Sequence, residues 1–213
     1  MQEIERYSKR ARVQHWIVVV CSLLLAITGL FLFVHLFGSA AEGGASRIIH
    51  RVAAVVFVAV PVIYFMLNPR RTLEWIKEAF TWGKADLGWA KAAPTYYFGF
   101  DIIPMPPQER SNSGQKMWMV VVITMGIVLV VSGGIMWFGK GLVPPGVFQW
   151  TVFVHDLAFI VGGAMLLVHV ILGTIHPRFS EALRSMIGGK VSAHYAKDHH
   201  GKWYDRISNG KAG

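Results

Sequence analysis

The chain has 213 residues, of which 54% are hydrophobic and only 15% carry a charge. With four apolar stretches of about twenty residues or more, this composition excludes an ordinary soluble domain and is typical of a polytopic membrane protein. The net charge of +9 indicates contact with anionic lipid rather than nucleic acid, because the Lys and Arg residues flank the apolar stretches. The single cysteine, Cys21, excludes a c-type haem attachment motif, an internal disulfide and an iron–sulfur cluster held by this chain alone.

The apolar stretches predict an all-α integral membrane protein, a bundle of four transmembrane helices within a single domain, 1–213. The predicted helices cover about 14–37, 48–67, 115–138 and 150–175. A cytoplasmic loop, 68–114, is expected between the second and third helices, and a cytoplasmic tail, 176–213, after the fourth.

The predicted loop has two parts of different character. From Thr72 onward, apolar and charged residues follow a helical period, which predicts an amphipathic helix lying in the membrane interface. The second part, 83–111, is rich in proline, and we expect it to be irregular. Its prolines are Pro94, Pro104, Pro106 and Pro107. The tail is polar and basic, and it is expected to be partly helical through about Ile187.

Positive charge is distributed unevenly between the predicted loops. The segment before the first helix, the long loop and the tail are all rich in Lys and Arg, whereas the two short loops carry only Arg47, Arg51 and Lys140. Because cytoplasmic segments carry the excess of positive charge, both termini are expected in the cytoplasm and the two short loops on the other side.

Four histidines lie near the ends of the predicted helices, in two pairs at matching depths. His155 and His169 are fourteen residues apart, nearly four helical turns, so both imidazoles lie on one face about 21 Å apart along the axis. His50 matches the depth of His155 on the outer side, and His15 matches that of His169 on the cytoplasmic side. Six-coordinate haem iron takes two strong axial ligands, which facing helices of a four-helix bundle can supply. The pattern therefore predicts two haem b groups, the outer bound by His50 and His155 and the inner by His15 and His169.

Other interpretations of these histidines were weighed. Zinc would need a third or fourth protein ligand at each depth, and neither depth offers one. His35, near the end of the first helix, competes for the outer site and is interpreted as an interfacial hydrogen-bonding residue, because His155 already has a partner in His50. His176 is interpreted as a polar group at a helix end and not as a ligand.

Several motifs resemble the gamma subunit of membrane-bound respiratory formate dehydrogenases. They are RVQHW, RIIHR, NSGQKMW and the tail MIGGKVSAHYAKDHHGKWY. The resemblance extends over essentially the whole chain, although the histidine pattern alone is shared with the di-haem cytochrome b subunits of nickel–iron hydrogenases. It implies a four-helix cytochrome b with two haems, held by the same pairs that the depths predict. It also implies that the chain lies in the inner membrane of a bacterium.

The resemblance also implies a quinone, menaquinone or ubiquinone, that is reduced beside the inner haem. In this chain the implied residues are Asn112, Gly114, Gln115 and His169. Independently, Asn112 and Ser113 can cap the third helix, where exposed N–H groups and side-chain amides suit a quinone carbonyl. A helix cap alone explains the same residues equally well.

The predicted function is that of the electron-transfer subunit of a formate:quinone oxidoreductase. Electrons would come from a periplasmic iron–sulfur beta subunit, and through it from a molybdenum or tungsten formate dehydrogenase alpha subunit, within an assembly that can form a higher oligomer. This chain itself has no formate-oxidising site. The alternatives are a cytochrome b subunit of a nickel–iron hydrogenase or another molybdenum oxidoreductase, and, in a different class, a small membrane transporter or assembly protein with structural histidines.

Overall fold

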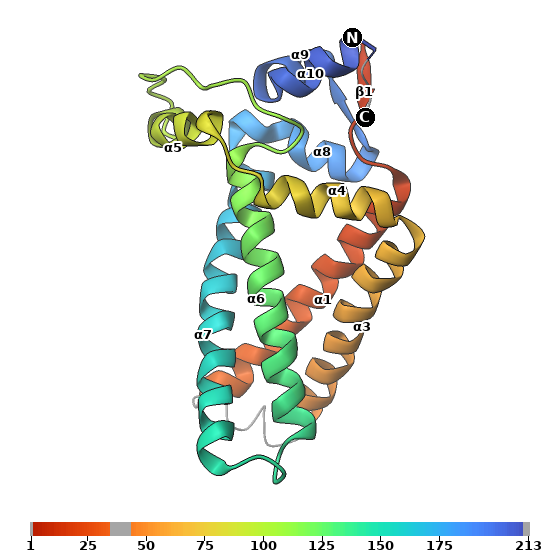
Figure 1. Ribbon diagram of the computed structural model, residues 1–213, viewed down its shortest axis with the longest axis vertical. Helices are drawn as coiled ribbons and strands as arrows, with labels where there is room; N and C mark the ends of the chain where they lie inside the picture. The colour runs from red at the N-terminus through yellow and green to blue at the C-terminus, as the bar shows by residue number, and fades with distance from the viewer. Residues whose placement is uncertain (1, 35–43, 211–213) are drawn as a thin grey trace. The chain divides into compact units, whose positions relative to one another are not determined.

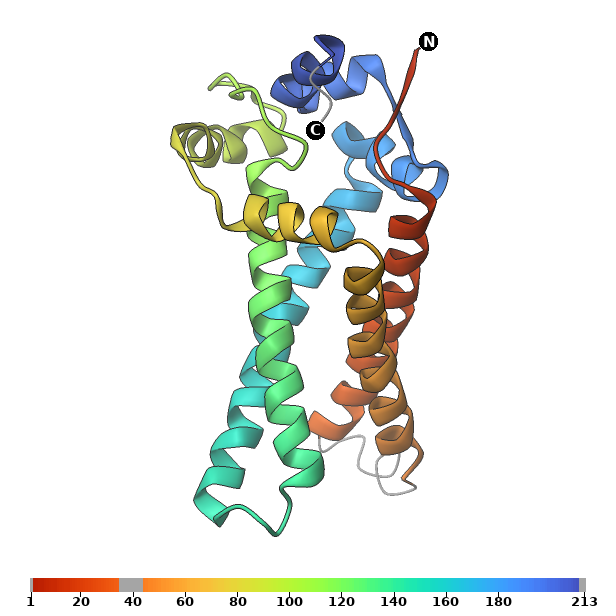
Figure 2. The ribbon, with the colours of Figure 1, turned by 45° about the vertical axis from the view of Figure 1, so that its right-hand side comes forward.

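The computed structural model describes residues 2–34 and 44–210, and it is almost entirely helical (Figures 1 and 2). Within this part of the chain, four helices are long and apolar enough to cross a membrane. They are α1 (Lys9–Phe33), α3 (Ala45–Leu67), α6 (Ser113–Phe138) and α7 (Pro145–Val170), the last continued by a π-helical turn, η2 (Ile171–Ile175). The prediction of an all-helical chain with four helices long and apolar enough to span a membrane is confirmed.

The helix ends differ from the prediction where polar residues extend an apolar stretch. Helix α1 begins at Lys9 rather than at residue 14, because basic residues can continue a helix into the interface although they interrupt the hydropathy pattern. Helix α7 begins at Pro145 rather than at residue 150, since proline is well tolerated in the first turn. Helix α1 ends at Phe33, and His35 lies outside the described residues.

The outward faces of the spanning helices are apolar. Large side chains such as Val20, Ile127 and Leu167 are more than half exposed. So large an apolar surface would be unfavourable in water, whereas the hydrocarbon of a bilayer would cover it. Length and exposed apolar surface therefore agree in assigning these helices to a membrane.

The chain divides into two compact units. The spanning unit comprises Lys9–Pro69 and Val121–His169, and the polar unit comprises Met1–Ser8, Arg70–Val120 and Val170–Gly213. Within the spanning unit, α1 packs against α3 (Figure 2). The buried side chains of these two helices are small, and small side chains let helix backbones approach closely in a membrane. They are Cys21, Thr28, Ser46 and Ala53.

Outside the spanning helices, the chain forms short elements. They are β1 (Glu3–Glu5), α4 (Pro69–Phe80), α5 (Lys84–Tyr97), η3 (Pro177–Phe179), α8 (Ser180–Gly188), β2 (Lys190–Ser192), α9 (Ala193–His199) and α10 (Gly201–Ser208). Helix α4 is the amphipathic helix predicted from Thr72. The expectation of irregular structure at Pro94 was wrong, because this proline lies in the last turn of α5, where it removes only one helical hydrogen bond.

A two-stranded ladder joins the beginning of the chain to its tail. Strands β1 and β2 are antiparallel, and Ile4 lies opposite Val191. Val191 belongs to a buried cluster that also contains Tyr195 and Trp203, and Ile4 packs against this cluster. The ladder was not predicted, because three-residue strands show no usable periodicity. The polar tail is therefore a folded part of the polar unit rather than a solvated extension.

His200 is buried in the polar unit in its neutral form. It is 1% exposed, and its Nδ1 donates a hydrogen bond to the Glu109 carbonyl at 2.8 Å. Burial, reinforced by the nearby charge of Arg6, lowers the pKa of His200 to about 2. The folded chain therefore excludes a proton that the unfolded chain would bind in mildly acidic solution.

We expect the polar unit to lose stability as the pH falls below 6.5, the ordinary pKa of histidine. The loss from His200 should be about 1.4 kcal/mol for each pH unit, because the unfolded state binds a proton there and the folded state does not. Protease resistance of the tail between pH 7.5 and 4.5 measures this dependence. His200→Gln keeps a donor for Glu109 without the titration and should flatten the curve; an unchanged curve would show that other groups dominate.

Candidate functional site

Within the spanning unit, two pairs of histidine rings face each other. The ring centroids of His50 on α3 and His155 on α7 are 6.4 Å apart, and those of His15 on α1 and His169 on α7 are 6.5 Å apart. The ring planes are inclined by 60° in the first pair and 62° in the second. The structure thus brings together the residues that depth matching paired, in two nearly identical arrangements.

The separations fit a metal ion between the rings. A metal ion bonds an imidazole nitrogen at about 2.0 Å, and the ring centroid lies roughly 1 Å farther out, so two rings on one ion have centroids roughly 6–6.5 Å apart. Both pairs match this spacing. The same spacing would suit a haem iron held between the two imidazoles of a pair.

Hydrogen bonds define which nitrogen atoms of the His50–His155 pair are available as ligands. His50 Nδ1 lies 2.9 Å from Thr28 Oγ1, and His155 Nδ1 lies 2.8 Å from Ser132 Oγ. Each hydroxyl donates its proton within its own helix, Thr28 to the Leu24 carbonyl and Ser132 to the Val128 carbonyl, both at 2.6 Å.

A hydroxyl group has a single proton. Since that proton is already directed to a backbone carbonyl, the Thr28 and Ser132 oxygens must accept a hydrogen bond from the imidazole. The Nδ1 atoms of His50 and His155 therefore carry the protons, and each Nε2 presents a lone pair. This is the tautomer that can bind iron through Nε2.

A glycine follows each of these hydroxyl residues and lies against the same ring. A Cβ atom at Gly29 would lie 3.5 Å from His50 Cε1, and one at Gly133 would lie 3.3 Å from His155 Cε1. We call Thr28–Gly29 and Ser132–Gly133 the hydroxyl–glycine pairs. Neither was predicted from the sequence, although the recurrence of Thr-Gly and Ser-Gly in two different spans was a visible signal.

The other histidines have different surroundings. His15 Nδ1 is buried and has no hydrogen-bond partner among the described residues. His176, in the polar unit, donates from Nε2 to the Tyr97 carbonyl at 3.0 Å and stands at the N-terminal end of η3. This position is consistent with the interpretation of His176 as a polar group at a helix end.

The N-x-G-Q motif begins α6 within the polar unit. Asn112 Oδ1 accepts from the Gln115 backbone N–H at 2.8 Å, and Gln115 Oε1 accepts from the Asn112 backbone N–H at 3.0 Å. These bonds form a reciprocal cap, in which the amide oxygen of each side chain accepts a hydrogen bond from the backbone. Each side-chain amide also has an NH2 group that can donate to a carbonyl oxygen.

Gly114 has a packing role in the same turn. A Cβ atom there would lie 2.9 Å from Trp89 Cζ2 on α5, closer than such atoms can approach. Glycine therefore allows the indole of Trp89 to cover the first turn of α6.

A buried ion pair anchors this end of α6. Lys116 Nζ lies 3.1 Å from Asp86 Oδ1, and both residues are 8% exposed. Burial pushes the pKa of Asp86 upward, but hydrogen bonds from Ser113 and Gly83 and the Lys116 charge outweigh this and hold the pKa below its ordinary value. The sequence analysis did not identify this pair, because its partners are thirty positions apart.

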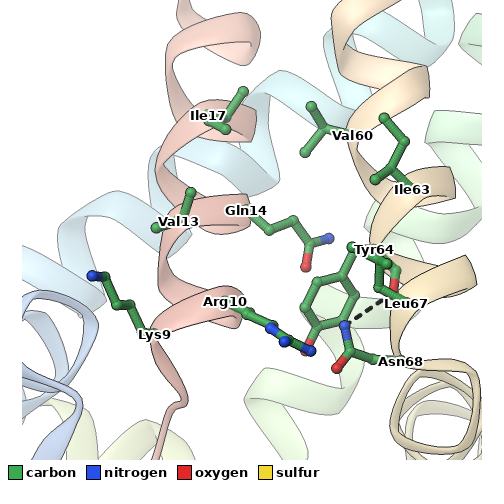
Figure 3. Close-up of a pocket in the computed structure, with 10 residues that line it drawn as sticks. All are labelled: Lys9, Arg10, Val13, Gln14, Ile17, Val60, Ile63, Tyr64, Leu67 and Asn68. Carbon is green, nitrogen blue, oxygen red and sulfur yellow. Dashed lines mark hydrogen bonds between the residues drawn. The ribbon is translucent and has the colours of Figure 1, made fainter.

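A groove with a volume of about 600 Å³ lies between α1 and α3 (Figure 3). Its apolar walls include Val13, Ile17 and Val60, whereas Arg10 and Tyr64 lie toward one end. None of the four paired histidines is among the described residues that line it. An apolar groove with a cationic residue at one end is typical of a surface that faces lipid.

Four spanning helices with two pairs of facing imidazoles define a class of protein, the membrane-spanning b-type cytochromes. Residues 6–189 match the family described as prokaryotic cytochrome b561. The match covers most of the chain, and the chain belongs to this family. Membership implies haem b as the cofactor.

Three relatives have similar lengths. The cytochrome b556(Fdn) subunit of the nitrate-inducible formate dehydrogenase of Escherichia coli K12 is 27% identical, over 94% of this chain and 90% of that subunit. The cytochrome b556(fdo) subunit of formate dehydrogenase from the same strain is 28% identical, over 96% of this chain and 93% of the subunit. The cytochrome b556 subunit of formate dehydrogenase from Haemophilus influenzae is 26% identical, over 94% and 82%. The resemblance predicted from the motifs is confirmed.

Replacing Asp86 with Ala should destabilise the protein by about 3 kcal/mol, because the Lys116 ammonium is then buried without its counter-charge. The double variant Asp86→Ala/Lys116→Met should recover much of this loss. Thermal unfolding in detergent measures both effects. Glu3→Gln, which removes the exposed Lys190–Glu3 ion pair, serves as the control and should change little. A double variant no more stable than Asp86→Ala would contradict the role of the charge.

Proposed function

We propose that this chain is the di-haem cytochrome b subunit of a formate:quinone oxidoreductase. Haem b bound by each imidazole pair would carry single electrons between the two sides of the membrane. The proposed partners are an iron–sulfur beta subunit on the periplasmic side and, through it, a molybdenum or tungsten formate dehydrogenase alpha subunit. The names of the relatives support formate as the electron source, and the electrons would leave to menaquinone or ubiquinone.

The observation that carries this proposal is the pair of matched ring separations within the spanning unit. Transporters and assembly proteins can place a histidine in a membrane, but such a residue needs only a hydrogen-bond partner. Two pairs with the spacing of a bis-imidazole metal site, and with an Nε2 lone pair on both outer rings, support haem ligation. We assign His50 and His155 to the outer haem and His15 and His169 to the inner one.

The proposed orientation places both termini in the cytoplasm. The ladder between β1 and β2 supports a common side of the membrane for both, because it pairs the beginning of the chain with the tail. The long loop joins them, since the Lys202 backbone N–H donates to the Gln108 carbonyl at 3.0 Å. The excess of Lys and Arg in these segments supports the cytoplasmic side of the inner membrane.

The proposed quinone residues are Asn112, Gly114 and Gln115, together with His169. The reciprocal cap orients both amide side chains at the start of α6, and each has an NH2 group suited to a quinone carbonyl. Reduction increases the negative charge on that oxygen, which strengthens hydrogen bonds from such donors. The proposed chemistry therefore uses the nitrogen atoms of the side chains whose oxygen atoms cap the helix.

Replacing His155 with Ala should remove the outer haem, and replacing His15 with Ala should remove the inner one, because each haem loses an axial ligand. The ratio of haem to polypeptide, measured after extraction of the pigment, should fall from two to one in either variant. His194→Ala, at a histidine that is 79% exposed, is the matched control and should retain two. Two haems in the His155 or His15 variant would rule out the assigned ligand.

Two conservative variants separate the cap from the quinone. Gln115→Glu and Asn112→Asp keep the capping oxygens and remove the NH2 donors, so both should fold with two haems but reduce quinone at least tenfold more slowly. Quinone-dependent oxidation of the dithionite-reduced protein, followed by haem absorbance, measures the rate. Wild-type rates in both variants would show that these residues serve only as a helix cap.

A further inference from the structure

We infer that Thr28 and Ser132 are positioning residues that tune the outer haem through its two ligands. The inference rests on the proposed ligation by His50 and His155 but goes beyond it. It assigns a role to one hydroxyl on α1 and one on α6, neither of which would touch the iron. The basis is geometric: each oxygen lies within hydrogen-bond distance of an Nδ1 atom, at 2.9 Å for Thr28 and 2.8 Å for Ser132.

The two hydroxyls are buried and engaged on both sides. Thr28 is 5% exposed and Ser132 is 4% exposed. Each donates to a carbonyl of its own helix and accepts from an imidazole of the neighbouring helix, α3 for Thr28 and α7 for Ser132. Such a chain of hydrogen bonds fixes both the tautomer and the rotation of the ring. Gly133, which follows Ser132, leaves room for the edge of the His155 ring, since a Cβ atom there would lie 3.3 Å from His155 Cε1.

The hydrogen bonds have an electronic consequence. An acceptor on the remote N–H makes an imidazole a stronger electron donor toward a metal. Stronger donation favours ferric over ferrous iron and therefore lowers the reduction potential. Both ligands of the outer haem receive this effect, whereas His15 of the inner pair has no acceptor for Nδ1 among the described residues. Thr28 and Ser132 thus hold the outer haem at a lower potential than it would have without them.

The test is a potentiometric titration of the haem absorbance of the purified complex carrying Thr28→Val, Ser132→Ala or both. We expect the midpoint potential of the outer haem alone to rise. In the double variant the equilibrium constant for its reduction should increase about tenfold, equivalent to about 59 mV for a one-electron couple. Thr28→Ser and Ser132→Thr keep the hydroxyl and should restore the wild-type potential. Thr151→Val is the matched control, because the Thr151 hydroxyl on α7 donates to the Val147 carbonyl, and its potentials should not move.

Each outcome bears on the inference separately from the proposed function. Unchanged potentials in Thr28→Val and Ser132→Ala, with two haems retained, would overturn it. Loss of the outer haem in Ser132→Ala but not in Ser132→Thr would support it, since the hydroxyl would then be needed to orient the ligand. Loss in both would overturn it, because shape rather than the hydrogen bond would matter. A complex without b-type haem, or a His155→Ala variant with both haems, would instead refute the proposed function.

Discussion

The separation between facing imidazole rings is the constraint on which the spanning unit depends. A metal ion accepts two axial nitrogens only over a narrow range of distance, and the two ring pairs meet this requirement at 6.4 and 6.5 Å. Helix α7 supplies one ring to each pair, so its register determines both. The first two spanning helices must then present His15 and His50 at the corresponding depths.

The hydrocarbon environment explains why the His50 and His155 rings need neighbours of a particular kind. A buried N–H group without an acceptor is costly in a medium that contains no water. Thr28 and Ser132 each accept a hydrogen bond from an imidazole N–H and donate their own hydroxyl proton to a backbone carbonyl. Gly133 matters for packing, because a Cβ atom there would lie only 3.3 Å from the edge of the His155 ring, closer than an ordinary contact. A hydroxyl residue thus provides the hydrogen bond that the imidazole needs, and the glycine next to it lies against the same ring.

The sequence predicted the features that arise from local patterns. Hydropathy predicted the four spans, and the fourteen-residue spacing of His155 and His169 placed both on one helical face. The helix starts at Lys9 and Pro145 were missed, because the charged or turn-forming residues there lower the local hydropathy although they are helical. The contacts between the hydroxyl–glycine pairs and the imidazoles, and the Asp86–Lys116 pair, could not be predicted, because each joins distant parts of the chain through side chains.

The ladder between β1 and β2 has a consequence for biogenesis. Ile4 pairs with Val191, so the ladder can form only after all four spanning helices, which lie between these residues in the sequence, have been synthesised. Contacts so distant in sequence form slowly, because a long loop must close before they do. The helices can enter the membrane one after another during translation, but the polar unit can be completed only after the last of these helices has been synthesised. Formation of the β1–β2 ladder is therefore a late step in the folding of the chain.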